Sequence, residues 1–158
     1  MRVLARRLAE LAGTGFYTGY FPIAPGTVGS IVAVAICVVL ERLHLLSANG
    51  PAGWALLIVA VFAVGLPSAR HLERRFGSDN KRIVIDEIWG MMISLALLPQ
   101  SPGYLIGGFL LFRCFDIVKP FPARRAERIG GGLGVMLDDG IVGVYANLAL
   151  RLARVLLG

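Results

Sequence analysis

The sequence has little charge, and three long stretches of it have none. Of its 158 residues, 16% are charged and 56% are hydrophobic, which departs from soluble globular averages toward membrane proteins. No charged residue occurs in residues 11–40, 45–69 or 88–112. Each stretch exceeds the roughly 20 apolar residues that cross a bilayer, although prolines and glycines interrupt all three. We therefore predict an integral membrane protein with several spans.

Cysteine and histidine are also scarce, with two of each. Cys37 and Cys114 lie in apolar runs, and neither is followed six positions later by the arginine that a cysteine phosphatase needs. His44 and His71 are isolated, whereas a histidine-based lipid phosphatase needs paired histidines in polar motifs. We expect both cysteines to be buried, unpaired thiols without a metal or redox role.

Hydrophobic runs separated by prolines predict five apolar helices. Their expected ranges are residues 27–44, 52–73, 84–98, 103–118 and 138–157. Residues 1–12 place leucines and arginines largely on different helical faces, which predicts a short helix on the membrane surface. The expected fold class is an all-α, compact multi-helix membrane bundle. It forms a single domain over residues 1–158, with a Gly/Pro loop at 13–26 before the bundle at 27–157.

The positive charges predict the orientation of this bundle. If the N-terminus is cytoplasmic and all five helices cross, thirteen of the sixteen Lys and Arg residues fall on the inner side. Only Arg42, Arg151 and Arg154 remain outside. This orientation also brings acids from three helix ends to the cytoplasmic face.

Those acids are the most unusual feature of the sequence. Asp86 and Glu87 begin the third predicted helix, Asp116 lies near the end of the fourth, and Asp138 and Asp139 begin the fifth. Ionised acids in hydrocarbon are costly unless they are paired, bind a metal or line a wet cavity. Mg²⁺ prefers carboxylate oxygens together with water and substrate phosphate. The pattern therefore predicts a metal-dependent enzyme that acts on a phosphate at the inner lipid interface.

Simpler roles remain open for some of these acids. Asp138 and Asp139 would also suit a helix start, where acids cap the helix and complement its dipole. Asp116 would also pair with Arg113 or Lys119, each three residues away on the same helical face. The remaining acids are interpreted as ordinary solvated or interfacial charges: Glu10, Glu41, Glu73 and Glu127.

Basic residues and a glycine-containing loop complete the predicted site. Arg113 and Lys119 flank Asp116, where both would bind a phosphate whose charge a metal shares. Gly26 and Thr27 lie near a helix start and would offer N–H groups and a hydroxyl to that phosphate, or serve only as a turn into the helix. Three further arginines either face anionic head groups or only follow the positive-inside bias: Arg124, Arg125 and Arg128.

Four segments, in this order, closely resemble the phosphatidylglycerophosphatase A family. They are PIAPGTVGS at 22–30, SDNKRIVIDEIWG at 78–90, FRCFDIVKPFPARRAE at 112–127 and GGLGVMLDDGIVGVYAN at 131–147. The resemblance implies Mg²⁺-dependent hydrolysis of phosphatidylglycerophosphate to phosphatidylglycerol and phosphate. It also implies a multi-pass protein of a bacterial inner membrane with its active site facing the cytoplasm.

The resemblance assigns roles to particular positions. The catalytic residues would be Asp86, Glu87, Arg113, Asp116, Lys119, Asp138 and Asp139. The metal ligands would be Asp86, Glu87, Asp138 and Asp139. The substrate would be bound by Gly26, Thr27, Asp79, Arg113 and Lys119. The nucleophile is either a water molecule or an aspartate that forms a phospho-enzyme, and Asp116 is either a general base or a ligand of a second metal.

The expected partners are the anionic phospholipid substrate and the membrane, with no nucleic acid, while a homo-oligomer is left open. The alternative function is a membrane assembly protein or a small ion carrier whose acids form only structural ion pairs. A carrier predicts acids spread across the bilayer, whereas these cluster at one face.

Overall fold

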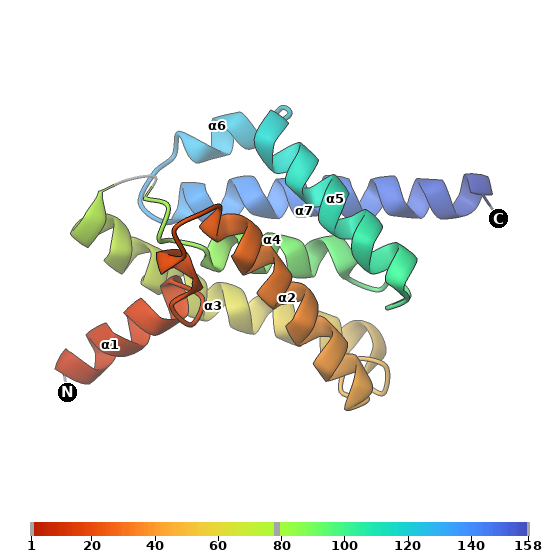
Figure 1. Cartoon of the computed structure of the whole chain (residues 1–158), viewed down its shortest axis with the longest axis horizontal. Helices are drawn as coiled ribbons and strands as arrows, with labels where there is room; N and C mark the ends of the chain where they lie inside the picture. The colour runs from red at the N-terminus through yellow and green to blue at the C-terminus, as the bar shows by residue number, and fades with distance from the viewer. Residues whose placement is uncertain (1, 78–79, 158) are drawn as a thin grey trace.

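The computed structural model describes residues 2–77 and 80–157, and within them the chain folds into helices with no strand. The described residues form seven α-helices and one 3₁₀ turn, and Figure 1 shows how the helices are arranged. Their bounds are α1 Arg2–Gly13, η1 Thr18–Tyr20, α2 Pro25–Arg42, α3 Gly50–Phe76, α4 Ile85–Leu95, α5 Pro102–Val118, α6 Ala123–Glu127 and α7 Leu133–Leu157. The predicted all-α class is confirmed for this part of the chain.

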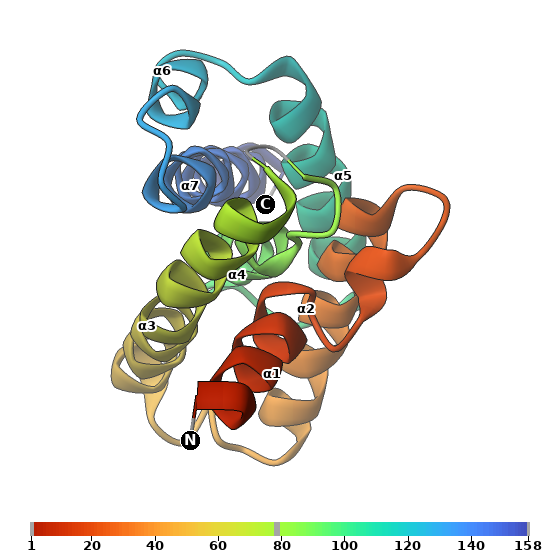
Figure 2. The ribbon, with the colours of Figure 1, turned by 90° about the vertical axis from the view of Figure 1, so that its left-hand side faces the viewer.

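Helix α4 lies at the centre of the bundle. It packs against α2, α3, α5 and α7, and most extensively against α7 (Figures 1 and 2). Nine of its eleven residues are buried. A Cβ atom at Gly90 would lie only 2.6 Å from the Asp139 carbonyl oxygen, so the two helix backbones approach at a position that only glycine fits. This close packing brings the first turn of α4 beside the acids of α7.

The number of membrane-crossing helices differs from the prediction. Among the described residues, only α2, α3 and α7 are long and apolar enough to cross a membrane, so five apolar spans are not confirmed. The 11 residues of α4 extend over about 16 Å at 1.5 Å per residue. For α4 the reason is burial, because its apolar residues form the core of the bundle instead of a lipid-facing span. Helix α5 is more exposed but has only 17 residues.

The C-terminal end of α4 is capped by side chains from α7. The Asn147 amide donates hydrogen bonds to the carbonyls of Ile93, Ser94 and Ala96, at 3.3, 3.0 and 2.9 Å. Arg151 donates a further hydrogen bond to the Ala96 carbonyl at 3.1 Å. The last carbonyls of a helix have no partner within the helix. These bonds therefore allow α4 to end within the bundle.

Helix α7 begins earlier than the sequence indicated. Its first residue is Leu133, so Asp138 and Asp139 lie in its second turn and do not cap its start. The connection from α6 ends with Gly130, Gly131 and Gly132, which all have φ between 66° and 72°. This left-handed conformation favours glycine. The capping interpretation of the two aspartates was therefore wrong.

The N-terminal segment forms the predicted short helix. In α1, Val3, Leu4 and Leu8 are exposed, with 55–66% of their surface accessible. Glu10 connects α1 to α3 through an ion pair of 2.6 Å with Arg75. The placement of α1 on a membrane surface stays a prediction.

The two cysteines differ in their environments. Cys37 is buried in the core, whereas Cys114 is exposed, so the expectation of a buried thiol was wrong for Cys114. Cys114 follows Ile106 and Leu110 at four-residue spacing on α5, and both of these side chains are 60% exposed. Cys114 therefore lies on an exposed apolar face of α5.

Candidate active site

A cavity of about 570 Å³ lies among the starts of α2, α4 and α7 and the end of α5. Figure 1 shows these helix ends. The cavity is lined by eight of the residues that the sequence predicted for the site: Gly26, Asp86, Glu87, Arg113, Asp116, Lys119, Asp138 and Asp139. Thr27 is half-buried in the first turn of α2 and does not line the cavity. Asp79 lies outside the described residues.

Three carboxylates converge in this cavity. Asp86 and Glu87 come from the first turn of α4 and Asp139 from α7, and one oxygen of each lies within 4.8 Å of the others. Asp86 and Asp139 are 7% and 3% exposed. One oxygen each of Asp86, Glu87, Asp138 and Asp139 is buried without a hydrogen-bond partner. Buried anionic oxygens that lack partners are costly, so this arrangement favours a bound cation.

The same crowding opposes ionisation of the acids on α4. Burial raises the pKa of Asp86 well above its usual range, and the nearby carboxylates of Glu87 and Asp139 raise it further. Burial also raises the pKa of Glu87, although a hydrogen bond with Asp86 and the Arg113 charge partly oppose this. A divalent cation would compensate the negative charge, and carboxylate oxygens are the donors that Mg²⁺ prefers.

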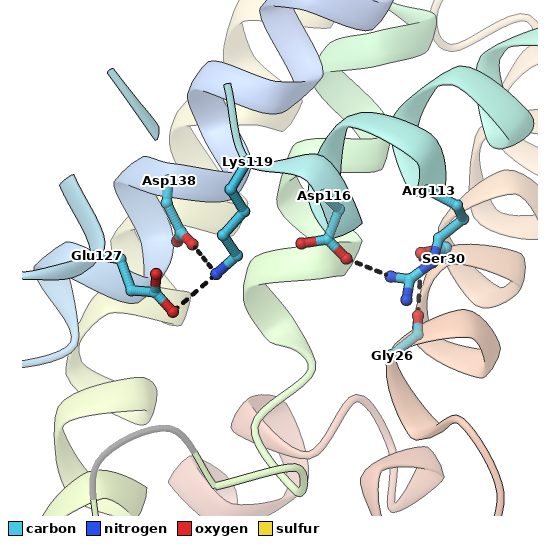
Figure 3. A network of polar contacts seen from close by, with 7 residues as sticks. All are labelled: Gly26, Ser30, Arg113, Asp116, Lys119, Glu127 and Asp138. Carbon is cyan, nitrogen blue, oxygen red and sulfur yellow. Dashed lines mark hydrogen bonds and ion pairs between the residues drawn. The ribbon is translucent and has the colours of Figure 1, made fainter. Parts of the chain in front are cut away.

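Two cations at the cavity, one on α5 and one directly after it, are held by ion pairs (Figure 3). Lys119 Nζ lies 2.6 Å from Asp138 Oδ2 and 2.9 Å from Glu127 Oε1. Arg113 Nη1 lies 2.9 Å from Asp116 Oδ2, in an ionic contact that lacks hydrogen-bond alignment. The predicted pairing of Asp116 with Arg113 is therefore present, within a cavity that both side chains line.

Lys119 ends α5 and bridges two other helices. It adopts a left-handed backbone conformation, with φ of 46°, directly after the last residue of α5. Burial lowers the pKa of Lys119, but its hydrogen bonds to Asp138 and Glu127 outweigh this effect and raise the pKa above the usual range. Lys119 therefore carries a positive charge at the cavity, fixed between α6 and α7.

Gly26 provides space for the acid cluster. It is buried in the first turn of α2, and its carbonyl accepts a hydrogen bond of 2.9 Å from Ser30 Oγ (Figure 3). A Cβ atom at Gly26 would overlap Glu87 Oε1, would lie 2.9 Å from Glu87 Cδ and would lie 3.4 Å from Arg113 Nη1. The glycine thus lets the start of α2 approach the Glu87 carboxylate.

Sequence reasoning missed several cavity residues. Glu127 was interpreted as an ordinary surface charge, but it binds Lys119. Glu73, Asn80 and Lys81 also line the cavity. The ion pair joins residues eight apart across the turn from α5 into α6, a spacing with no helical signature. The sequence therefore contains no periodic signal that would identify Glu127.

Comparison with known proteins gives consistent matches over most of the chain. The phosphatidylglycerophosphatase A family model matches residues 11–154. A relative from Bacteroides thetaiotaomicron is 41% identical over 96% of both chains and carries the provisional description phosphatidylinositol-3-phosphatase.

Two further relatives are described as phosphatidylglycerophosphatase A. The protein from Escherichia coli is 33% identical, over 87% of this chain and 78% of its own. The protein from Haemophilus influenzae is 35% identical, over 89% of this chain and 85% of its own. No solved structure matches this chain.

Proposed function

Because this chain belongs to the phosphatidylglycerophosphatase A family, a family of phosphatases, we propose that it hydrolyses the phosphomonoester of phosphatidylglycerophosphate. The products are phosphatidylglycerol and inorganic phosphate. We further propose that the reaction requires Mg²⁺ and takes place at the cytoplasmic surface of a bacterial inner membrane.

One observation carries this proposal. The cavity combines three converging carboxylates with two fixed cations at the end of an apolar helical bundle. Four buried carboxylate oxygens without partners need a positive charge. Lys119 and Arg113 would remain beside that charge to bind an anion. A lipid with a phosphomonoester on its head group fits the carboxylates, the cations and the apolar bundle. Its phosphate would bind the metal and the cations, while its acyl chains stay in the membrane.

Asp86, Glu87 and Asp139 would hold the cation, since their oxygens lie closest together. When bound, Mg²⁺ would polarise the phosphoryl group and disperse its negative charge. Asp138 was predicted as a fourth ligand. One of its oxygens binds Lys119, while the other is buried without a partner, so it stays a proposed ligand.

The chain's own cations would position and neutralise the phosphate. Lys119 presents a compact ammonium fixed by two acids, and Arg113 presents a planar guanidinium beside Asp116. Preorganised charges of this kind stabilise developing negative charge because they need little rearrangement during the reaction. Gly26 would let a phosphate oxygen and the Glu87 carboxylate share the start of α2, a role that supports the predicted Gly26 site.

The chain path and the positive charges support the proposed orientation of the site. Helix α4 leads away from the cavity and α5 leads back to it. The start of α4 and the end of α5 are therefore on the same side of the membrane, whether or not these two helices cross it. The arginine-rich connection from α5 to α7 lies at the cavity end. By the positive-inside rule, these arginines support our proposal that the cavity faces the cytoplasm.

This orientation predicts the labelling of two introduced cysteines. In a background with Cys37→Ala and Cys114→Ala, a membrane-impermeant maleimide should label Ser47→Cys in intact bacterial spheroplasts. It should label Ile129→Cys only after permeabilisation. Both positions are exposed, and they lie at opposite ends of the bundle. The reverse labelling pattern would refute a cytoplasmic active site.

Phosphate release from defined lipids tests the proposed activity. Purified protein in neutral detergent micelles should release phosphate from phosphatidylglycerophosphate when Mg²⁺ is present and lose this activity in EDTA. Phosphatidylinositol 3-phosphate belongs in the same experiment because of the description of the Bacteroides relative. We expect phosphatidylglycerophosphate to be the preferred substrate. If neither lipid releases phosphate, the result would favour the assembly or ion-carrier alternative. Phosphate release that EDTA does not affect would contradict the metal site.

A further inference from the structure

A second cavity, of about 510 Å³, adjoins the proposed catalytic cavity. It is lined by Val118, Lys119, Phe121, Arg124, Arg125 and Arg128. Lys119 and Arg128 line both cavities, so the two adjoin at these side chains. Four of the six lining residues carry positive charge and none is acidic. The second cavity is therefore suited to an anion.

Helix α6 presents two of these arginines outward. Ala123 and Ala126 are buried against the bundle, which leaves Arg124 and Arg125 on the exposed face. Arg124 Nη2 donates a hydrogen bond of 3.2 Å to the Val118 carbonyl, and the Arg125 guanidinium lies 4.8 Å from the centre of the Phe121 ring. These contacts hold the arginines at the cavity. No ion pair joins either arginine to an acid within residues 2–77 and 80–157.

Two apolar lining residues of the second cavity, and two apolar residues next to its lining in the sequence, are exposed. Ile117, Val118, Phe121 and Ile129 are between 57% and 76% exposed. Exposed apolar residues beside arginines are typical of surfaces that contact the membrane interface, where aliphatic groups meet lipid and guanidinium groups meet phosphate. A phospholipid lying here would have its phosphodiester at the level of the arginines.

We propose that the second cavity binds the phosphodiester of the lipid substrate while the terminal phosphomonoester occupies the catalytic cavity. This inference rests on the proposed lipid phosphatase function. Guanidinium groups suit the task because they bind phosphate oxygens through paired, charge-assisted hydrogen bonds. Lys119 and Arg128 lie where the two phosphates of one head group approach each other.

The second cavity would affect which lipids the protein binds. Phosphatidylglycerophosphate and phosphatidylinositol 3-phosphate both carry a phosphomonoester on a head group joined through a phosphodiester. The second cavity therefore recognises what these lipids share and leaves discrimination between glycerol and inositol to other contacts. Phosphatidic acid, a phosphomonoester without a phosphodiester, would lack this interaction.

Inhibition by two soluble anions tests the subsite. Phosphate release from phosphatidylglycerophosphate is measured in neutral detergent micelles for wild type, for the Arg124→Gln/Arg125→Gln double variant and for Arg154→Gln, a control that removes one positive charge near the end of α7. The inhibitors are glycerophosphoglycerol, which contains only the phosphodiester, and inorganic phosphate, which fits the catalytic cavity. Both replaced arginines are exposed, so the double variant should fold normally.

The double variant should weaken inhibition by glycerophosphoglycerol about tenfold and raise KM for the lipid, with kcat retained. Inhibition by inorganic phosphate should stay unchanged, and Arg154→Gln should match wild type. Equal glycerophosphoglycerol inhibition of wild type and double variant, or equal weakening of both inhibitors, would overturn the subsite. If phosphate release by the double variant falls below wild type only when anionic phosphatidylserine is added to the micelles, the arginines bind surrounding lipid. This result would also overturn the subsite. A wild-type protein that releases no phosphate would overturn the proposed function itself.

Discussion

Replacing Asp86 with Asn is expected to lower Mg²⁺-dependent phosphate release by about a hundredfold or more, the largest effect that the structure predicts for one side chain. The substitution preserves shape but replaces a carboxylate with a neutral amide, and Asp86 is one of the three acids that converge in the cavity. The measurement is kcat/KM for phosphatidylglycerophosphate over a range of Mg²⁺ concentrations.

A thermal stability measurement separates this effect from misfolding. Because burial and neighbouring carboxylates oppose ionisation of Asp86, its neutral replacement should not destabilise the protein in EDTA. Mg²⁺ should raise the melting temperature of wild type but not that of Asp86→Asn. Glu41→Gln, at the far end of α2, removes an acid outside the cavity and should behave as wild type. An active Asp86→Asn variant would exclude Asp86 from the metal site.

Gly26→Ala is expected to reduce activity by about a hundredfold while leaving the fold intact. Alanine is intrinsically favoured over glycine within a helix, by about 0.5–1 kcal/mol. Its Cβ would nevertheless overlap the Glu87 carboxylate, which must then leave its present position beside Asp86 and Asp139. The measurement pairs a melting curve with phosphate release at saturating Mg²⁺.

Gly103→Ala provides the matched control for this prediction. Gly103 lies in the first turn of α5, and a Cβ there would meet no atom within 4 Å. Its activity should equal that of wild type. If Gly26→Ala and Gly103→Ala were equally active, the close approach of α2 to Glu87 would have no functional role.

The sequence predicted the positions of the longer helices because their signals are local, but it did not predict α6. Prolines at Pro25, Pro51 and Pro102 occupy the first or second positions of α2, α3 and α5, where a helix tolerates them. The expected helices overlap the observed ones over most of their length. The start of α7 was misplaced because the sequence interpretation began the helix at its first acidic residues, whereas the left-handed glycines end at Gly132.

The number of spans was not predictable from hydropathy alone. An apolar segment has the same hydropathy whether its side chains face lipid or other helices. Met91, Met92 and Leu95 of α4 are at most 1% exposed, because α4 fills the middle of the bundle. Its short length depends on Asn147 and Arg151 capping its end, and these residues lie some 50 positions further along the chain.

The sequence predicted which acids gather at the candidate site, but not which partner each acid contacts. The charge distribution placed the acids at one end of the bundle, and the structure gathers five of them around one cavity. Packing then separates Asp138, which binds Lys119, from Asp139, which turns toward Asp86 and Glu87. Adjacent residues on a helix point in different directions, so neighbouring helices decide which partner each meets.

Binding of Mn²⁺, followed by electron paramagnetic resonance, tests most directly whether the converging acids form a metal site. Mn²⁺ accepts the same carboxylate ligands as Mg²⁺, and its free aqueous signal falls when it binds protein. Wild type and Glu41→Gln should both reduce the free signal, and added Mg²⁺ should restore it by competition. Asp86→Asn and Asp139→Asn should leave the signal near that of free Mn²⁺. Equal Mn²⁺ binding by wild type and both aspartate variants, or none by wild type, would contradict the assignment of these acids as metal ligands.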